Sequence, residues 1–388
     1  MSKIKSLKPE NSTSIWPSWP NFGKKEITSA VRVVKSNQLF AKTEVAKFEK
    51  EFGEYNSSKY VKGVGNATQG LHLALSALEI GFGDEVIVTS FSWISTASCI
   101  LMQNAKPVFV DIELDTLGAD PSKIEKAITK KTKAIIIVHM FGNPCKINAI
   151  KKIALKNKIY LIEDASHAHG SRLNNKNCGN FSDIAVFSVH QRKNLCAGEG
   201  GLVISKNKIL DDKIYKLRSF GSDKLSYNYR MTEFSAAIGR VSLKKLDKEN
   251  KIRNRNVIYL NKKLNNKYYR ILLPMKNCYS SFHKLPLLYN YNNFKKNIDF
   301  FIHFMNLRGV PFSKAYTPLH HHSNFNQDKK INTSFPNVKL NYSKEIYKNC
   351  EEICYKRLTE LSIHKPVDKK LLDKLIILLD KYVKKFGK

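Results

Sequence analysis

A chain of 388 residues is long enough to bury a large core and to form one large and one smaller structural unit. Its hydrophobic fraction of 42% and charged fraction of 26% are those of a globular protein rather than of a disordered chain. No apolar run approaches the roughly 20 residues that span a bilayer, and the first residues contain no apolar signal region. We therefore expect no membrane partner and a cytoplasmic location.

The formal net charge of +33 is the most unusual property of the composition. Only 11 of the 66 basic residues are arginines, and the lysines are spread along the whole chain. A nucleic-acid-binding surface more often clusters its basic residues, with arginine enriched and aromatic residues interleaved. We therefore interpret the charge as a diffuse lysine-rich surface and expect no nucleic-acid partner. Such a field would still attract an anionic small molecule.

The seven cysteines are an odd number and include no CxxC pair, which is typical of a reduced, intracellular protein. Cys350 and Cys354 are spaced so that they would stack on one face of a helix. Two buried thiols are the simpler interpretation of that pair, and a metal site the less favoured one.

From about residue 60 to residue 205, apolar runs rich in β-formers alternate with segments of helical periodicity. The expected helices include Leu71–Leu78 and Ile147–Leu155. The expected strands are Val86–Thr89, Val108–Asp111, Ala134–His139, Tyr160–Glu163, Ile184–Ser188 and Leu202–Ser205. This alternation predicts an α/β fold with a mostly parallel central sheet between two layers of helices.

The pattern changes after about residue 245. A strand is expected at Lys284–Tyr289, where Pro286 suggests an edge position. The expected helices are Lys245–Leu264, Phe294–Leu307, Ser343–Arg357 and Lys369–Lys385. We therefore divide the chain into an irregular lead-in at 1–40, which could close over a site, a large domain at 41–245 and a smaller C-terminal α/β domain at 246–388.

An acid and a lysine follow two of the expected strands. Asp164 ends the apolar run that begins at Ile159, and Lys193 lies between the strand that ends at Ser188 and the glycine-rich turn Gly198–Gly201. Ligands bind beyond the carboxyl ends of the strands in such sheets, so Asp164 and Ser188 are expected to share one crevice. A lysine amine can condense with an aldehyde, and a buried carboxylate can keep a pyridine nitrogen protonated. The pair therefore indicates pyridoxal 5′-phosphate as the cofactor.

At these residues the sequence resembles the DegT–StrS family of aminotransferases, which have the fold of type I pyridoxal phosphate enzymes. The resemblance extends over nearly the whole chain. Its further motifs are Gly65-Asn66-Ala67-Thr68, Gly83-Asp84-Glu85-Val86-Ile87-Val88, Pro107-Val108-Phe109-Val110-Asp111, Tyr227-Asn228-Tyr229-Arg230-Met231-Thr232 and Tyr316-Thr317-Pro318-Leu319-His320. Their order and spacing make the match specific, although each motif alone is weak.

The resemblance implies a role for each matching residue. Lys193 would form the Schiff base and then carry a proton, while Asp164 would pair with the pyridinium nitrogen. His167 would contact the ring oxygen of the cofactor, where the family often has glutamine. Trp93 would stack on the pyridine ring, unless it is simply a core tryptophan.

Four residues are expected to reach the phosphate. Ala67 and Thr68 lie at a helix start that offers unpaired backbone amides, although Thr68 could be an ordinary cap. Ser188 could add its hydroxyl. Asn228 matches the family position that reaches the phosphate from a neighbouring subunit, which implies a homodimer with a shared site.

Four weaker candidates lie on the substrate side, and a plain packing or surface role is equally open for His190 and Arg230. The candidates are His190, Arg230, Tyr316 and His320. The run from His320 to His322 suggests a metal, but adjacent histidines on a loop need not converge and no carboxylate lies at ligand spacing. We therefore predict no metal site.

The resemblance implies a transaminase that takes an amino group from an amino acid, glutamate or glutamine, and gives it to a keto sugar. A nucleotide-linked sugar is favoured, as in polysaccharide or lipopolysaccharide biosynthesis. A keto cyclitol is the alternative acceptor. The lead-in Trp16-Pro17-Ser18-Trp19-Pro20 and the run Asp164-Ala165-Ser166-His167-Ala168-His169-Gly170 are similar to those of members that act on cyclitols or on aminohydroxybenzoate precursors. A non-catalytic regulator of the same fold is a further alternative. A sister branch that removes sugar hydroxyls has histidine in place of the lysine, so Lys193 argues against it.

Overall fold

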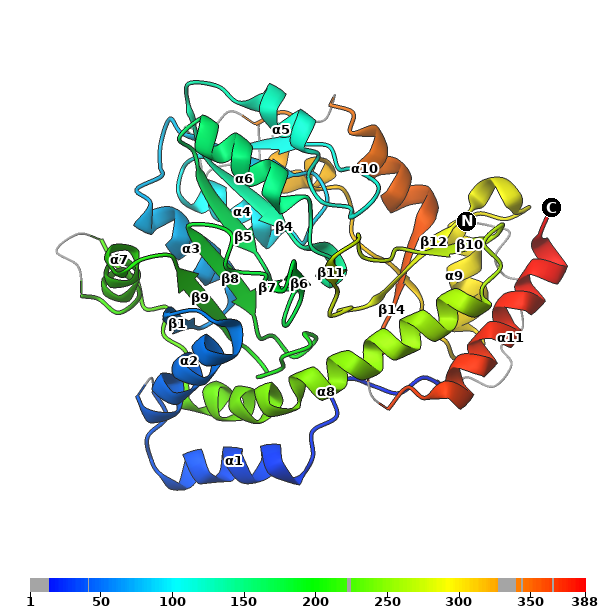
Figure 1. The fold of residues 1–388 in the computed structure, drawn as a ribbon, viewed down its shortest axis with the longest axis horizontal. Helices are drawn as coiled ribbons and strands as arrows, with labels where there is room; N and C mark the ends of the chain where they lie inside the picture. Colours follow the sequence, from blue (N-terminus) through cyan, green and yellow to red (C-terminus); the bar gives the residue numbers. More distant parts are fainter. Residues whose placement is uncertain (1–13, 41, 222–224, 327–339, 343–344, 365) are drawn as a thin grey trace.

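A seven-stranded sheet forms the centre of the larger part of the molecule (Figure 1). The computed structural model describes residues 14–388 except 41, 222–224, 327–339, 343–344 and 365. The strands of this sheet are β1 (Tyr60–Val64), β2 (Glu85–Thr89), β3 (Lys106–Val110), β4 (Thr132–Val138), β5 (Tyr160–Asp164), β8 (Ile184–Ser188) and β9 (Gly201–Ser205). They lie in the order β1-β9-β8-β5-β4-β2-β3, and within this sheet only β9 runs antiparallel to its neighbours. The predicted mostly parallel sheet is thereby confirmed.

All six strands expected between residues 60 and 205 belong to this sheet, each within about two residues of its expected start. The seventh strand, β1, was not among them. Lys62 interrupts its apolar run, and the lysine side chain pairs with Asp211 of α7 (Lys208–Arg218) instead of entering the core.

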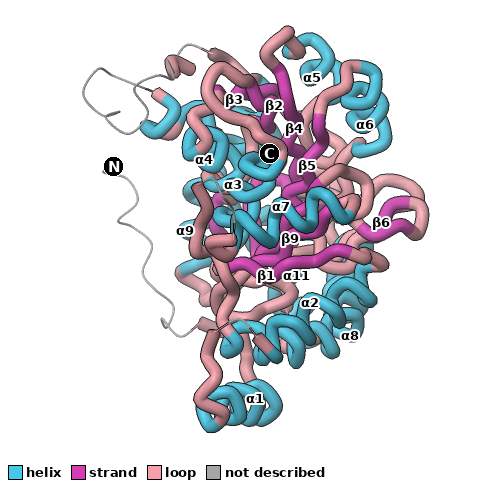
Figure 2. The backbone as a smooth tube through the Cα atoms, turned by 90° about the vertical axis from the view of Figure 1, so that its left-hand side faces the viewer, coloured by secondary structure: helices cyan, strands magenta, loops and turns pink. Residues whose placement is uncertain are grey.

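Helices cover both faces of the sheet, which Figure 2 shows as strands between two groups of helices. Val86 and Val88 share one buried cluster with α3 (Ala67–Ala77) and α4 (Ser95–Met102). Ile87, between them in sequence, belongs to another cluster with α5 (Pro121–Ala127) and α6 (Ile147–Lys156). This alternation follows from the two-residue period of a strand, and it explains why the strands read as continuous apolar runs.

The smaller part of the molecule is built on a four-stranded antiparallel sheet in the order β10-β12-β14-β13. These strands are β10 (Tyr269–Ile271), β12 (Leu285–Tyr289), β13 (Ser313–Lys314) and β14 (Leu358–Leu361). They pack with α9 (Ile298–Asn306) and α11 (Lys369–Phe386) around a core rich in aromatic residues.

The edge position expected for the strand that contains Pro286 is wrong, because β12 has a neighbour on each side. The proline is tolerated because its carbonyl still accepts a hydrogen bond from the N–H of Leu272, at 3.1 Å. The β10–β12 register runs from Leu287 to Tyr289, so Pro286 lies just beyond it, where its missing N–H interrupts the ladder least.

One long helix, α8 (Glu233–Lys263), belongs to both parts and runs below them in Figure 1. Ala236 and Leu246 pack in a cluster under the large sheet, whereas Val257 and Leu260 pack in the core of the small part. The division predicted at 245/246 therefore falls inside a continuous helix rather than in a linker.

The lead-in is more regular than expected. It contains α1 (Lys24–Lys35), which packs along α8 and is tied to it by an ion pair between Glu26 and Lys245. Trp16 is buried, and its indole N–H donates to the carbonyl of Ser362 at 2.6 Å. After α1 the chain continues into α2 (Thr43–Asn56). Residues 1–13 of the lead-in lie outside the described part.

Shorter elements complete the fold. A small sheet joins β6 (Arg172–Leu173), β7 (Lys176–Asn177) and β11 (Cys278–Tyr279). The helix expected at 343–357 begins later, as α10 (Lys348–Glu352), and continues as the π-helical turn η5 (Ile353–Arg357); residues 343 and 344 lie outside the description. Cys350 and Cys354 stack there as predicted, with their sulfurs 3.9 Å apart. The 3₁₀ turns are η1 (Met140–Gly142), η2 (Tyr291–Asn293), η3 (Leu319–His321) and η4 (Ser323–Phe325). Among the described residues, no helix has the length and apolar character needed to cross a membrane.

Candidate active site

Asp164 is the last residue of β5, where its carboxylate is buried and held by two hydrogen bonds. The Thr96 hydroxyl donates to Oδ2 at 2.8 Å, and the backbone N–H of Ser166 donates to Oδ1 at 3.2 Å. Ser92 hydrogen-bonds Thr96 in turn, with 2.7 Å between the hydroxyl oxygens. These contacts fix the direction of the carboxylate at the carboxyl end of the strand. Each carboxylate oxygen has a further lone pair for a ligand.

Lys193 lies in the turn that follows β8, and its backbone N–H donates to the carbonyl of His190 at 2.8 Å. Burial lowers the pKa of its amine to about 8, against the attraction of Asp164, which favours the charged form. The positive charge of Lys284 lowers this pKa further, whereas the negative charge of Glu360 opposes the shift. Near neutral pH the amine therefore has a useful neutral fraction, which is the form that attacks a carbonyl.

The expected phosphate-binding turn is the N-terminus of α3. Asn66 caps the helix, accepting from the N–H of Gln69 at 2.9 Å, so Thr68 is not the cap. The Thr68 hydroxyl instead donates to Ser95 Oγ at 2.7 Å. The first backbone N–H groups of a helix have no partner within it, and they suit an anion.

Gly201 brings this turn close to the end of β8. A Cβ at Gly201 would lie 2.9 Å from the backbone nitrogen of Ala67, so a side chain there would displace the turn. Gly201 is also the register partner of Ser188 across β8 and β9. Gly201 therefore adjoins both the start of α3 at Ala67 and the end of β8 at Ser188.

Three further predicted residues form one aromatic group. The His167 ring lies nearly parallel to that of Tyr316, with centroids 6.4 Å apart, and the Tyr316 hydroxyl is 3.4 Å from His167 Nε2. Trp93 meets Tyr316 edge-on at 6.1 Å, and it is 59% exposed, so it is not a core tryptophan. Burial, aided by the charge of Lys193, holds the pKa of His167 well below its ordinary value, so its imidazole is neutral.

The sequence did not indicate His283, which stacks on His167 with ring centroids 4.3 Å apart. The row continues edge-on to His364 at 6.4 Å, and His364 stacks on Trp19 of the lead-in at 4.2 Å. His169, in contrast, packs against Phe187, with ring centroids 5.4 Å apart.

Lys284 and Glu360 were also missed. Lys284, directly before β12, forms an ion pair with Glu360 on β14. The Ser313 hydroxyl donates to the same carboxylate oxygen of Glu360 at 3.3 Å. Their charges act on Lys193, so the small sheet contributes to the electrostatics of the site. No local signal could have found this pair, because its two members are 76 residues apart. Thr96 offered only a weak signal, as a hydroxyl residue in the polar segment after β2.

The remaining candidates make contacts elsewhere. Arg230 donates through Nε to Asn228 Oδ1 at 3.0 Å. Tyr229, between them, lies beside the turn before α3, because its carbonyl accepts from the N–H of Gly65 at 2.9 Å. His190 lies 3.6 Å from the carboxylate of Glu199.

The His320 ring is buried, and its Nε2 lies 3.1 Å from Glu351 Oε1. His190 also contacts the turn after β8, because its N–H donates to Ser188 Oγ at 3.3 Å and its carbonyl accepts from the N–H of Lys193, whereas His320 contacts Glu351.

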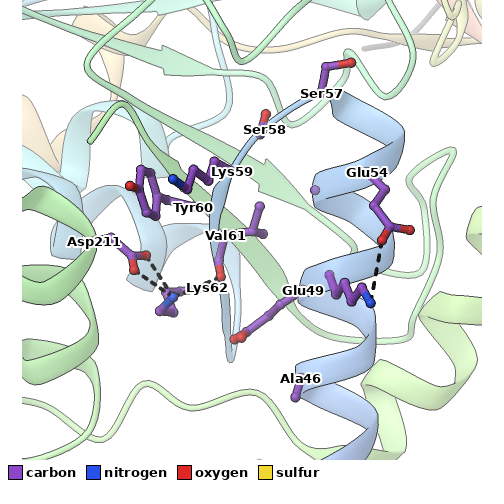
Figure 3. A pocket seen from close by; sticks show the side chains of 12 residues that line it. Ala46, Glu49, Glu54, Ser57, Ser58, Lys59, Tyr60, Val61, Lys62 and Asp211 are labelled. Atoms are coloured by element: carbon purple, nitrogen blue, oxygen red, sulfur yellow. Dashed lines mark hydrogen bonds and ion pairs between the residues drawn. The ribbon is translucent and has the colours of Figure 1, made fainter. Parts of the chain in front are cut away.

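The pocket drawn in Figure 3 lies apart from this group. It has a volume of about 580 Å3, and α2 and β1 provide most of its lining. Its charged groups already form pairs, with Lys62 2.8 Å from Asp211 and Lys50 3.9 Å from Glu54. The pocket borders the first half of β1, whereas Val64 at the other end of the strand leads to the start of α3. The pocket is therefore not the site described above.

The fold is that of a pyridoxal-phosphate-dependent aminotransferase. Comparisons with known proteins give the family. The model of the DegT/DnrJ/EryC1/StrS aminotransferase family matches residues 20–354. The chain belongs to this family.

Two sequence relatives and one solved structure illustrate the similarity. An uncharacterized protein of Methanocaldococcus jannaschii is 35% identical over 351 residues, which cover 85% of this chain and 91% of that protein. The GDP-perosamine synthase of Vibrio cholerae is 39% identical over 212 residues, which cover 53% of this chain and 58% of the synthase. An aminotransferase from Psychrobacter cryohalolentis superimposes with a TM-score of 0.88 at 27% identity, covering 95% of this chain and 99% of that one.

Proposed function

We propose that this aminotransferase moves the amino group of glutamate or glutamine to a keto sugar, with a nucleotide-linked sugar as the favoured acceptor. The single observation that carries the reaction type is the buried pair formed by a fixed carboxylate at Asp164 and a lysine of lowered pKa at Lys193. The similarity to a GDP-perosamine synthase supports a nucleotide-linked acceptor.

The residues fit pyridoxal phosphate at both of its ends. The Asp164 carboxylate can accept a hydrogen bond from the protonated pyridine nitrogen, because hydrogen bonds from Thr96 and Ser166 already fix its direction. Gly201 keeps the amide-bearing start of α3 free of a neighbouring side chain. When bound, this cofactor supplies an electron sink that stabilises negative charge on the substrate Cα.

Lys193 has two tasks in the proposed reaction. Its neutral amine would hold the cofactor through the aldehyde carbon. Once a donor amino acid had taken that place, Nζ would carry the proton between the substrate Cα and the C4′ carbon of the cofactor. With the keto acceptor, the same Nζ would carry the proton in the opposite direction.

Two aromatic residues orient the cofactor in this proposal. Trp93 presents an exposed flat face that suits stacking on the pyridine ring, worth on the order of 1 kcal/mol beyond burial. His167 is a neutral imidazole and can hydrogen-bond the ring oxygen without adding a positive charge. His190, Arg230, Tyr316 and His320 stay candidates for substrate contacts.

A keto cyclitol is the second candidate acceptor. Trp19 in the lead-in lies against His364, at the end of the ring row that begins at His167. The lead-in that resembles that of cyclitol-specific members therefore reaches the ring row, where it could contact a keto cyclitol. The net charge of +33 favours the nucleotide-linked sugar, because it would attract a diphosphate.

We also propose a homodimer with a shared site. Asn228 carries this part of the proposal, since its segment runs beside the phosphate turn at Gly65. An Asn228→Ala variant mixed with a Lys193→Ala variant should regain activity by subunit exchange if Asn228 serves the neighbouring site. Absence of any recovery from mixed dimers would exclude sharing.

The reaction is tested with purified protein, pyridoxal phosphate and Lys193→Ala. Wild-type protein should show the visible absorbance of the lysine-bound cofactor, and both this absorbance and turnover should disappear in the variant. Lys206→Ala is the matched control. Lys206 directly follows the last residue of β9, is largely exposed and pairs with Asp183. Full activity in Lys193→Ala would overturn the site. Keto sugars and cyclitols, screened with glutamate while 2-oxoglutarate is followed, then identify the acceptor.

A further inference from the structure

Two adjacent histidines and a distant glutamate converge where η3 meets α10. His320 Nε2 lies 3.1 Å from Glu351 Oε1, and His321 Nε2 lies 3.8 Å from the same oxygen. One ligand atom from each of the three residues lies within 4.8 Å of the other two. In the sequence, no carboxylate lies at ligand spacing from these histidines. The fold nevertheless brings one to them, from Glu351, which is 31 residues after His320.

The spacing of these atoms is that of a small coordination sphere. A tetrahedral zinc ion with bonds of about 2.0–2.1 Å separates its ligand atoms by about 3.3 Å. The two measured separations from Glu351 Oε1, 3.1 and 3.8 Å, lie on either side of that value. The His321 side chain is 32% exposed, so an ion can reach it.

The surroundings also suit coordination. The His320 ring is buried, and its Nε2 faces the Glu351 carboxylate. His321 Nδ1 lies 2.7 Å from the Tyr355 hydroxyl, which fixes the ring with Nε2 directed at Glu351. Such a partner on the second nitrogen is typical of metal-binding histidines. The Glu351 side chain is 28% exposed, which leaves a route for an ion.

We propose that His320, His321 and Glu351 bind one zinc ion, with water in the fourth position. Two imidazoles and one carboxylate favour zinc over magnesium or calcium, which prefer oxygen ligands. The ion would clip η3, which begins three residues after Tyr316, onto α10. Tyr355 would act as a positioning residue for His321.

The test uses the full chain saturated with pyridoxal phosphate, without an affinity tag, and treated with a chelator. Zinc is restored by equilibrium dialysis and bound metal is counted by mass spectrometry in wild type, His321→Ala, Glu351→Gln and His322→Ala. The last is the matched control, a neighbouring histidine outside the cluster. Wild type and the control should each bind one zinc more than the other two variants, whose affinity should be at least tenfold weaker.

Two further measurements keep the outcome decisive. Tyr355→Phe, a conservative change at a partly exposed ring, should weaken zinc binding by about tenfold. Zinc should raise the melting temperature of wild type and His322→Ala but not of Glu351→Gln. Equal zinc binding in all variants, or none in wild type, would overturn the proposal. Lys193→Ala should bind the same zinc as wild type, so the metal site and the proposed reaction are tested separately.

Discussion

The two sheets of this molecule build the site in different ways. The large parallel sheet positions Asp164 and Ser188 by topology, because the carboxyl ends of β5 and β8 meet at one edge. The small antiparallel sheet positions Lys284 and Glu360 by cross-strand pairing, and it contributes charge rather than a reacting group. In the proposed reaction, the large sheet sets where the chemistry occurs, whereas the charges of the small sheet adjust the pKa of Lys193.

The largest effect is expected from Asp164→Asn in the large sheet. The amide keeps the shape and can still meet Thr96, but it cannot hold a proton on a pyridine nitrogen. We expect turnover to fall on the order of 100-fold or more, as when a fixed electrostatic partner is removed from an active site. Asp115→Asn, at a side chain 69% exposed, serves as the control, and a comparable fall there would refute the assignment.

The next effect concerns stability, at the neighbour of Asp164. Glu163 is fully buried and accepts from His139 at 2.9 Å and from the backbone N–H groups of Gly179 and Phe181 at 2.7 and 2.8 Å. Glu163→Ala should lower the free energy of unfolding by about 3–5 kcal/mol, because it leaves these donors without their acceptor. Urea unfolding at pH 7 measures this change.

The same carboxylate gives a pH dependence of known sign. Burial alone would raise the pKa of Glu163, but hydrogen bonds and the charge of His139 outweigh it, and the net pKa is lowered. A lowered pKa in the folded state contributes stability that is present above the unfolded value of about 4.3 and is lost as the pH falls through the folded value. Glu163→Gln should therefore flatten the acid limb of the stability profile. An unchanged acid limb would contradict this prediction.

A smaller effect tests the contribution of the small sheet. Lys284→Met combined with Glu360→Gln removes both charges without leaving one of them buried alone. If Lys284 lowers the pKa of Lys193 and Glu360 opposes it, the double variant should titrate close to wild type, whereas Lys284→Met alone should titrate at higher pH. The rate at which cofactor-free protein gains visible absorbance on addition of pyridoxal phosphate, followed against pH, reports the titration of the free amine. The idea fails if both variants titrate together with wild type.

The smallest effect is expected at the far end of the ring row. Trp19→Leu removes a stacked ring whose contribution is on the order of 1 kcal/mol, which corresponds to about a fivefold change in the KM of the acceptor. The change should spare the KM of the amino-acid donor. An equal change for both substrates would show that Trp19 acts only on the fold.

The sequence was sufficient for six of the seven strands of the large sheet and for the class of enzyme, because apolar strands and strand-end polar residues are local signals. The roles assigned to Asp164, Lys193 and the start of α3 remain predictions. The contacts with His283, Lys284 and Glu360 could not be predicted, since they depend on how a second sheet pairs and packs. The edge assignment of β12 failed for a related reason: a proline excludes only one hydrogen bond, and the strand end can absorb that loss.

The continuous helix α8 has a mechanical consequence. This helix has 31 residues and packs both under the large sheet and in the core of the small part. It therefore provides no hinge between the two parts, because bending it would break main-chain hydrogen bonds in its middle. Opening and closing around a substrate is therefore expected to come from peripheral segments such as the one that carries Trp19, while the two sheets keep a fixed separation throughout the catalytic cycle.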